Sequence, residues 1–147
     1  MKMSGMITQL GLDSHRTFSS VTARDAQGEI VWRKRLEHAD RRPLRRELQT
    51  WPKGVPVVLE GTFGWGWLSD ELSAAGLDPH LASSKKVAAW RDARGLAKSN
   101  RTDADLLSEL WSQQPRCQRL VSGACCRRTV CPSGRTAFSR CAWLEDP

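Results

Sequence analysis

The sequence contains no tyrosine, no long hydrophobic run and no apolar leader. No stretch approaches the roughly 18 consecutive apolar residues that a membrane-spanning helix needs, which excludes an integral membrane protein. The first six residues, MKMSGM, contain no apolar core of a secretory signal. We therefore expect a protein with no membrane partner that is located in the cytoplasm.

Cysteine is absent from the first 116 residues, and all five cysteines lie between residues 117 and 141. They form no C-x-x-C pair and no histidine follows residue 80, so their spacing does not predict a structural zinc site. Residues 116–147 contain six of the 17 arginines, two acidic residues and no hydrophobic periodicity. We expect residues 113–147 to form an irregular, disordered basic tail of the kind that out-of-frame translation of a GC-rich gene would give.

Acidic residues are outnumbered, with 16 Asp and Glu against 23 Lys and Arg, and the formal net charge is +7. An excess of positive charge favours an anionic partner, and nucleic acid is the first candidate. The length of 147 residues is that of one domain. The charge alone, however, does not identify the partner, because many basic proteins bind no nucleic acid.

The hydrophobic pattern before residue 113 alternates between strand and helix periods. Leu10 and Leu12 lie on one face of a predicted strand, and the run VVL at 57–59 is typical of a strand buried on both faces. Strands are predicted over residues 6–13, 18–24, 29–36, 55–60 and 80–82, and helices over 40–51, 67–75, 85–94 and 102–111. A three-stranded meander followed by a β-α-β unit predicts an α/β fold, a mixed sheet with helices on its faces, over residues 6–112.

Acidic residues stand where two of the predicted strands end. Asp13 closes the first strand, and Glu60 follows the apolar run of the fourth. Glu60 is costly there unless it is paired or binds a cation, whereas Asp13 alone is equally explained as a turn-forming residue. Carboxylates from adjoining strand ends and a covering helix can converge, and oxygen ligands suit Mg²⁺ or Mn²⁺. Such ions can hold the attacking and leaving oxygens of a phosphodiester in line.

The last predicted helix supplies the third acidic group. Leu107 and Leu110 mark its buried stripe; Asp103 lies one turn before Leu107, and Asn100 lies a further turn before that. Asp105 falls on the opposite side and is expected to face water. The candidate catalytic residues, expected to converge in one cleft, are therefore Asp13, Glu60, Asn100 and Asp103, and the candidate metal ligands are Asp13, Glu60 and Asp103.

Four segments together resemble a known protein family. Residues 11–15 (GLDSH) resemble the opening motif of the DEDD insertion-sequence transposases, the "one-ten" family guided by a bridge RNA. Residues 60–68 (EGTFGWGWL) resemble that family's Glu-x-Thr-aromatic-x-Trp-x-Trp stretch. Residues 80–82 and 86–87 are similar to its next strand and helix, and residues 98–107 (KSNRTDADLL) to its Lys-x-Asp-Arg-x-Asp-Ala-x-x-Leu segment. The four occur in the family's order and cover residues 6–112.

The resemblance implies a ribonuclease-H-like, RuvC-like fold, similar to Holliday-junction resolvases, and a metal-binding tetrad of Asp, Glu, Asp and Asp. Asp13, Glu60 and Asp103 match the first, second and fourth members, and the third falls on Asn100. An amide offers a carbonyl oxygen but no charge, so we expect weaker Mg²⁺ binding. A different alignment would pair Asp103 with the third position and Leu106 with the fourth. We prefer the first alignment, which keeps the family's Arg, Ala and Leu at residues 101, 104 and 107.

The family's activity is DNA transposition, and the resemblance implies DNA, a structured guide RNA, and either a homo-oligomer or an intact transposase as partners. Family members carry a second, C-terminal domain with a nucleophilic serine, and the family pattern ends here near Pro115. We therefore expect a truncated or frameshifted transposase fragment that does not complete strand exchange alone.

Two alternatives to a catalytic fragment remain. The first is a non-catalytic RNA- or DNA-binding module derived from a transposase. The second is an ATP-using member of the actin and sugar-kinase fold, which also opens on a strand ending in Gly-x-Asp. Residues 14–17 (SHRT) are not the glycine-rich phosphate loop that this last class needs, so we rank it low.

Basic residues flank the acidic candidates along the chain. Such residues can bind a phosphate backbone, although a solvated charged face explains them nearly as well. The candidate nucleic-acid-binding residues are Arg16, Lys85, Lys86, Lys98 and Arg101.

Overall fold

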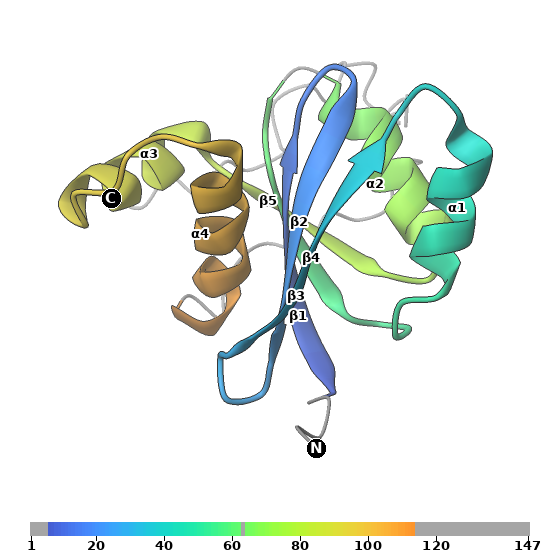
Figure 1. Cartoon of the computed structure of the whole chain (residues 1–147), viewed down its shortest axis with the longest axis horizontal. Coiled ribbons are helices and arrows are strands. Elements are labelled where there is room, and N and C mark those ends of the chain that lie inside the picture. Colours follow the sequence, from blue (N-terminus) through green and yellow to red (C-terminus); the bar gives the residue numbers. More distant parts are fainter. Residues whose placement is uncertain (1–5, 63, 114–147) are drawn as a thin grey trace, which may run out of the picture.

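The computed structural model describes residues 6–62 and 64–113, which form a five-stranded mixed sheet with helices on both faces (Figure 1). In chain order the elements are β1 (Ile7–Ser14), β2 (Phe18–Asp25), β3 (Ile30–Glu37), α1 (Arg41–Gln49), β4 (Pro56–Glu60), α2 (Trp65–Ala74), β5 (Asp78–Ala82), α3 (Ser84–Ala93) and α4 (Asn100–Gln113). The predicted α/β architecture is confirmed, whereas the predicted tail beyond residue 113 lies outside the described residues. Within the described ranges, no helix is long and apolar enough to cross a membrane.

The strand order is β3-β2-β1-β4-β5. β1 to β3 form an antiparallel meander, and β1, β4 and β5 are parallel to one another. The predicted meander and the predicted buried strand are therefore both confirmed. β4 lies between two parallel neighbours, and its central residues Val57, Val58 and Leu59 are completely buried.

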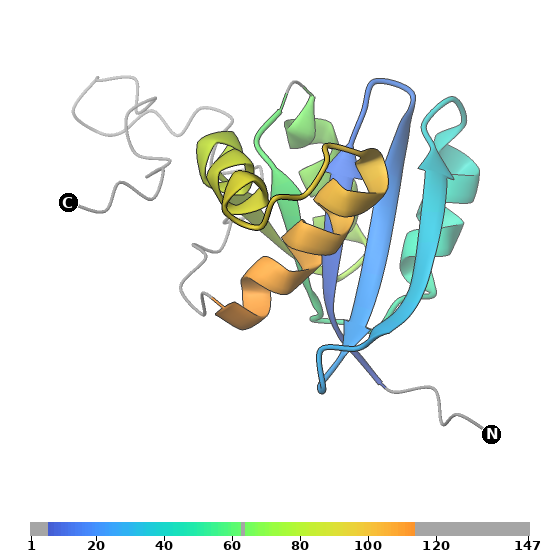
Figure 2. The same ribbon diagram turned by 60° about the vertical axis from the view of Figure 1, so that its left-hand side comes forward.

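The two faces of the sheet bury separate sets of apolar side chains, because successive strand residues point in opposite directions. Turning the molecule shows α1 and α2 on one side of the sheet and α3 and α4 on the other (Figure 2). The face under α1 and α2 packs Leu10, Leu12, Val57, Leu59, Leu44, Leu48, Leu68 and Leu72. The opposite face packs Val58, Ala82, Val87, Leu107 and Leu110.

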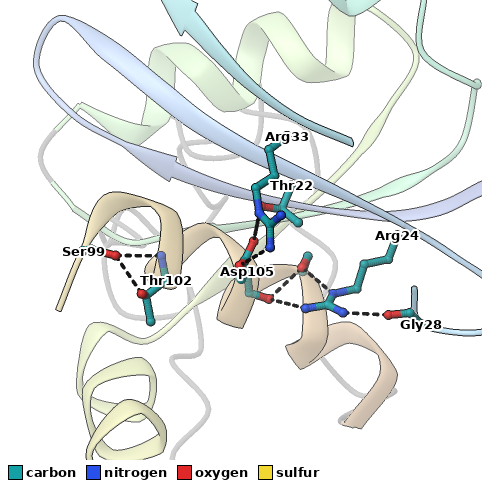
Figure 3. Close-up of polar contacts among 8 residues, drawn as sticks. Thr22, Arg24, Gly28, Arg33, Ser99, Thr102 and Asp105 are labelled. Atoms are coloured by element: carbon teal, nitrogen blue, oxygen red, sulfur yellow. Dashed lines mark hydrogen bonds and ion pairs between the residues drawn. The ribbon is translucent and has the colours of Figure 1, made fainter. Parts of the chain in front are cut away.

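Local signals account for where several elements begin. Asp40 is the N-cap of α1, and its side chain accepts a hydrogen bond from the backbone N–H of Arg42 at 2.9 Å. α4 begins two residues before the predicted start, because the Ser99 hydroxyl accepts from the backbone N–H of Thr102 at 3.0 Å (Figure 3). β5 is longer than predicted because Pro79 is tolerated in an edge strand, where one side of the backbone needs no partner.

Helix α4 lies in backbone contact with β1 at Gly11. A Cβ atom on Gly11 would lie 2.1 Å from the backbone nitrogen of Ser108 and 2.3 Å from the carbonyl oxygen of Ala104. Only a residue without a side chain permits this approach. The line of closest contact on α4 therefore runs through the small residues Ala104 and Ser108.

The prediction that Asp105 faces water is wrong. Because the contact line runs through Ala104 and Ser108, Asp105 lies on the flank of α4 that covers β2. Its carboxylate accepts hydrogen bonds from the Thr22 hydroxyl at 2.6 Å and from the Arg33 guanidinium at 2.9 and 2.8 Å (Figure 3). The neighbouring Arg24 donates to the Ser108 hydroxyl at 2.8 Å. This polar group fastens the helix to the antiparallel half of the sheet.

We expect Gly11→Ala to destabilise the domain by about 3 kcal/mol or more, because the atoms that a methyl group meets are backbone and α4 must move. The measurement is urea unfolding followed by circular dichroism. The matched control is Gly66→Ala in α2, where a Cβ meets nothing within 4 Å and alanine is the better helix former by about 1 kcal/mol. A Gly11→Ala protein as stable as the wild type would contradict the close approach.

Asp105→Asn should lower the free energy of unfolding by about 1–2 kcal/mol at pH 7. This is the contribution of a charged hydrogen bond, reduced because Arg33 is half-exposed. Burial opposes the charge, but hydrogen bonds from Arg33 and Thr22 outweigh it and hold the pKa of Asp105 below 3.8. A carboxylate whose pKa is lowered in the folded state stabilises the fold at pH values above its pKa in the unfolded chain. This stabilisation is lost as the pH falls through the pKa of the folded state. The stability difference between variant and wild type should therefore shrink below about pH 4. The exposed Asp92→Asn is the control.

Candidate functional site

Asp13 and Glu60 stand side by side at the carboxyl ends of two parallel strands. Leu12 of β1 is in register with Leu59 of β4, so the next residues of the two strands, Asp13 and Glu60, are neighbours at a strand spacing of about 4.8 Å. Asp13 lies two residues after Gly11, and Glu60 lies two residues after Val58. Because side chains two residues apart on a strand share a face, both carboxylates point to the face that α4 covers. Asp13 is buried and Glu60 is half-buried.

Asp103 joins this pair from the helix above. It precedes Ala104, whose carbonyl oxygen approaches Gly11, and it is 5% exposed. Charge repulsion from Asp103 and from Glu60 acts on Asp13, so the three carboxylates belong to one electrostatic group. We call Asp13, Glu60 and Asp103 the acidic cluster.

Asp13 is held in an unfavourable environment for its charge. Burial raises the pKa of Asp13 above its ordinary value of 3.8, and repulsion from Asp103 and Glu60 adds to the increase, while His15 acts in the opposite direction. The Nε2 atom of His15 lies 2.8 Å from Asp13 Oδ2, within ion-pair distance. The angles between these groups do not make a hydrogen bond, and within the described residues neither atom has another partner.

A third buried polar atom without a hydrogen-bond partner in the described part of the chain is Thr62 Oγ1. Thr62 follows β4 by two residues, at the same end of the sheet as Asp13 and His15. Buried polar atoms are nearly always paired in folded proteins, and an unpaired one calls for an explanation such as an ion or a water molecule. Two of the three atoms, Asp13 Oδ2 and His15 Nε2, form an ion pair with each other, so Thr62 Oγ1 is the atom that a water molecule or an ion at this end of the sheet would satisfy.

The sequence did not identify Arg91 as part of the site. Its Nη1 atom donates to Asp103 Oδ1 at 2.8 Å, and the side chains are 14% and 7% exposed. Arg91 lies four residues after the buried Val87 on α3, a spacing that places both on one face of the helix. That spacing was a readable signal that Arg91 points inward.

The oxygen donors present fit a hard divalent cation, since Mg²⁺ and Mn²⁺ prefer carboxylate ligands. The burial of Asp13 and the repulsion that Asp103 and Glu60 exert on it are the features that a cation would relieve. Asp103, however, is paired with Arg91, and within residues 6–62 and 64–113 no three acidic, histidine or cysteine side chains are arranged to hold a metal ion. The donor chemistry fits, and the arrangement of Asp103 must change for all three to bind one ion.

Asn100 occupies the outer edge of this region. It is the first residue of α4, about one turn before Asp103, and it is exposed. The exposed position is compatible with a ligand that joins from the solvent side. Its participation in the acidic cluster stays a prediction.

The predicted basic residues come from three elements near the same end of the sheet. Arg16 lies in the β1–β2 turn, Lys85 and Lys86 in the first turn of α3, and Lys98 and Arg101 around the start of α4. All are exposed except the half-buried Lys86. Because α3 follows the carboxyl end of β5 and Asp103 lies in the first turn of α4, these residues lie in segments at the end of the sheet that carries Asp13 and Glu60. We call them the basic rim. Their contact with a phosphate backbone stays a prediction.

No family model and no curated protein matches the chain. Among solved structures, it is similar to T. thermophilus RuvC in complex with a Holliday junction substrate, with a TM-score of 0.53 and 11% sequence identity. The match covers 76% of this chain and 99% of that chain. At this identity the similarity shows the fold alone: the described domain has the RuvC-like form of the ribonuclease-H-like fold.

We expect Asp13→Asn to stabilise the metal-free protein at pH 7 by about 1 kcal/mol, because functional residues are often held at the expense of stability. A carboxyl group with a raised pKa favours the folded state only while it is protonated, and this contribution is lost as the pH rises. The advantage of the variant should therefore disappear in acid, below about pH 4. Thermal unfolding in EDTA between pH 3 and 7 measures it, and a less stable variant at pH 7 would contradict the strained carboxylate.

Proposed function

We propose that this chain is a metal-dependent domain of a transposase or site-specific DNA recombinase, in which Asp13, Glu60 and Asp103 hold Mg²⁺ or Mn²⁺ beside a phosphodiester. The observation that carries the proposal is the convergence of three carboxylates on one end of a RuvC-like sheet, where burial and repulsion from Asp103 and Glu60 oppose the charge of Asp13. The four segments that resemble the DEDD insertion-sequence transposases support the same assignment.

A bound divalent cation would supply charge stabilisation at the reacting phosphate oxygens. The protein's own part is to position and to shield. β1 and β4 fix the spacing of Asp13 and Glu60, and α4 brings Asp103 over them. His15 lies 2.8 Å from Asp13 and can orient its carboxylate. The strand ends keep Asp13 and Glu60 in place before substrate arrives, and preorganised ligands of this kind lower a reaction barrier.

The basic rim is the proposed contact to the nucleic-acid backbone. The basic rim (Arg16, Lys85, Lys86, Lys98 and Arg101) lies in segments at the same end of the sheet as the acidic cluster, so a phosphate chain held by it would pass close to the carboxylates. We propose DNA as substrate, and a structured guide RNA and a second transposase subunit as partners. Binding to branched DNA should weaken steeply with salt, because each neutralised phosphate releases counterions.

A second candidate function is a non-catalytic nucleic-acid-binding module. The observation that favours it is Asn100, which stands where the resembled family has its third acidic residue. An amide lowers the negative charge that the cluster offers to a cation. In this case the fold and the basic rim would serve binding alone.

Glu60→Gln should lower the affinity of the full chain for Mn²⁺ by about tenfold or more, the usual effect of weakening a metal site. Isothermal titration calorimetry with MnCl₂ measures it. The matched control is Glu29→Gln, an exposed residue beside the β2–β3 turn at the other end of the sheet, which should leave the affinity unchanged. Equal Mn²⁺ affinities of Glu60→Gln and the wild type would refute the metal site.

Asn100→Asp separates the two functions. If the chain is a weakened catalytic domain, the added carboxylate should tighten Mn²⁺ binding and increase Mn²⁺-dependent cleavage of a branched DNA substrate. If the chain is a binding module, the variant should bind the same DNA and leave it uncut. The cleavage assay is run with Glu60→Gln added to Asn100→Asp, so that cleavage from a contaminating nuclease is recognised.

A further inference from the structure

Arg91 is a partly buried cation that contacts the acidic cluster through Asp103. Its guanidinium donates to Asp103 at 2.8 Å, and only 14% of its side chain is exposed. The hydrogen bond that Arg91 donates to Asp103 raises the pKa of Arg91, and attraction from Glu60 acts in the same direction. Arg91 therefore interacts with two of the three carboxylates that are proposed to bind metal.

Three carboxylates that share a partly buried site repel one another unless a positive charge lies among them. In the protein as the structure shows it, Arg91 is a cation at that place. An arginine cannot lose its proton in a protein, so Arg91 supplies one positive charge to the cluster at any pH at which the protein is folded. Its hydrogen bond also holds one Asp103 oxygen away from any other ligand.

The pairing of Arg91 with Asp103 explains why the acidic cluster has the ligands of a metal site but not their arrangement around an ion. The carboxylates are near enough for Asp103 and Glu60 to repel Asp13, but in the described part of the chain they are not arranged to hold an ion. The planar fork of a guanidinium suits carboxylate and phosphate oxygens alike. A guanidinium released from Asp103 would thus lie beside the place where a phosphate group approaches the cluster.

We propose that Arg91 is a resident counter-ion of the acidic cluster, which a divalent cation must displace from Asp103 in order to bind. This inference rests on the proposed metal site and names the group that competes with the metal ion for Asp103. Arg91 is thereby a positioning residue: it stabilises the metal-free protein and weakens metal binding by the same interaction.

Arg91→Met tests the competition, because it keeps an unbranched apolar stem and removes the charge. In EDTA the variant should unfold at a lower temperature than the wild type, since its carboxylates lose their counter-ion. Its affinity for Mn²⁺ should nevertheless rise, by about fivefold or more, because no group competes for Asp103. The increase in unfolding temperature on adding MnCl₂ should accordingly be larger than in the wild type. An arginine with a merely structural role would lower stability and metal affinity together.

The matched control is Arg94→Met. Arg94 also joins α3 to α4, through Glu109 at 2.5 Å, but does so outside the acidic cluster, so its loss should leave the Mn²⁺ affinity unchanged. Arg91→Lys keeps a positive charge and should restore most of the stability of the metal-free protein and most of the competition. If Arg91→Met does not fold, nitrogen-15 resonances of the Arg91 side chain in the wild type provide the test, and they should change as MgCl₂ is added.

The outcomes separate this inference from the proposed function. If the wild type binds Mn²⁺ through Glu60, but Arg91→Met binds it equally or more weakly, the counter-ion role is overturned and the metal site stands. An Arg91 resonance that does not respond to saturating MgCl₂ overturns it in the same way. If neither the wild type nor Arg91→Met binds Mn²⁺ at millimolar concentration, the proposed metal site fails and the inference fails with it.

Discussion

The arrangement of the domain depends on one close contact, the seating of α4 on Gly11. A side chain at this position would collide with the backbone of Ala104 and Ser108, so the helix reaches its place only because β1 presents no Cβ atom there. The contact fixes both the height and the rotation of α4 over the sheet. It turns Asp103 toward Asp13 on one flank and Asp105 toward Thr22 and Arg33 on the other. The candidate site and the polar anchor of the helix are thus two results of one constraint.

The two flanks of α4 treat negative charge in opposite ways. Asp105 is satisfied by a hydroxyl and a bidentate guanidinium, and its pKa is lowered. Asp13 is buried near two other carboxylates, and its pKa is raised. A structural carboxylate is stabilised in its charged form, whereas a functional one is often kept in a costly state that a ligand relieves. The difference between these carboxylates is what separates the candidate site from an ordinary ion-pair network.

Most of the fold could be predicted from the sequence because its signals are local. The alternation of Leu10 and Leu12, the apolar run before Glu60 and the cap at Asp40 each determine an element directly. The placement of Asp13 and Glu60 at neighbouring strand ends followed from the order of the strands. The rotation of α4 could not be predicted in this way, because large residues such as Leu107 and Leu110 suggested the contact line, while the true line follows the small residues Ala104 and Ser108.

The site was harder to predict than the fold because its neutralising partners are distant in the sequence. Arg91 is basic, and basic residues on a helix are usually solvated, so only its spacing from Val87 indicated an inward position. Asp105 falls opposite the stripe of Leu107 and Leu110, which predicts a solvated position, and its true partners Thr22 and Arg33 lie 83 and 72 residues away in the sequence. Helical periodicity indicates which residues of a helix share a face. It does not indicate which charged residues lie on the surface against which that face packs.

The polar anchor of α4 also determines when the site comes into existence as the chain is made. Thr22 and Arg24 contact residues of α4 that follow them by 83 and 84 positions. At a synthesis rate of about 5–20 residues per second, the residues of α4 that contact β2 are synthesised roughly 4–17 s after β2. During that interval the meander is uncovered on one face, and Asp13 has no Asp103 above it. The three carboxylates come together only when the last described helix docks on the sheet. The candidate ion-binding site therefore forms after the sheet in the nascent domain.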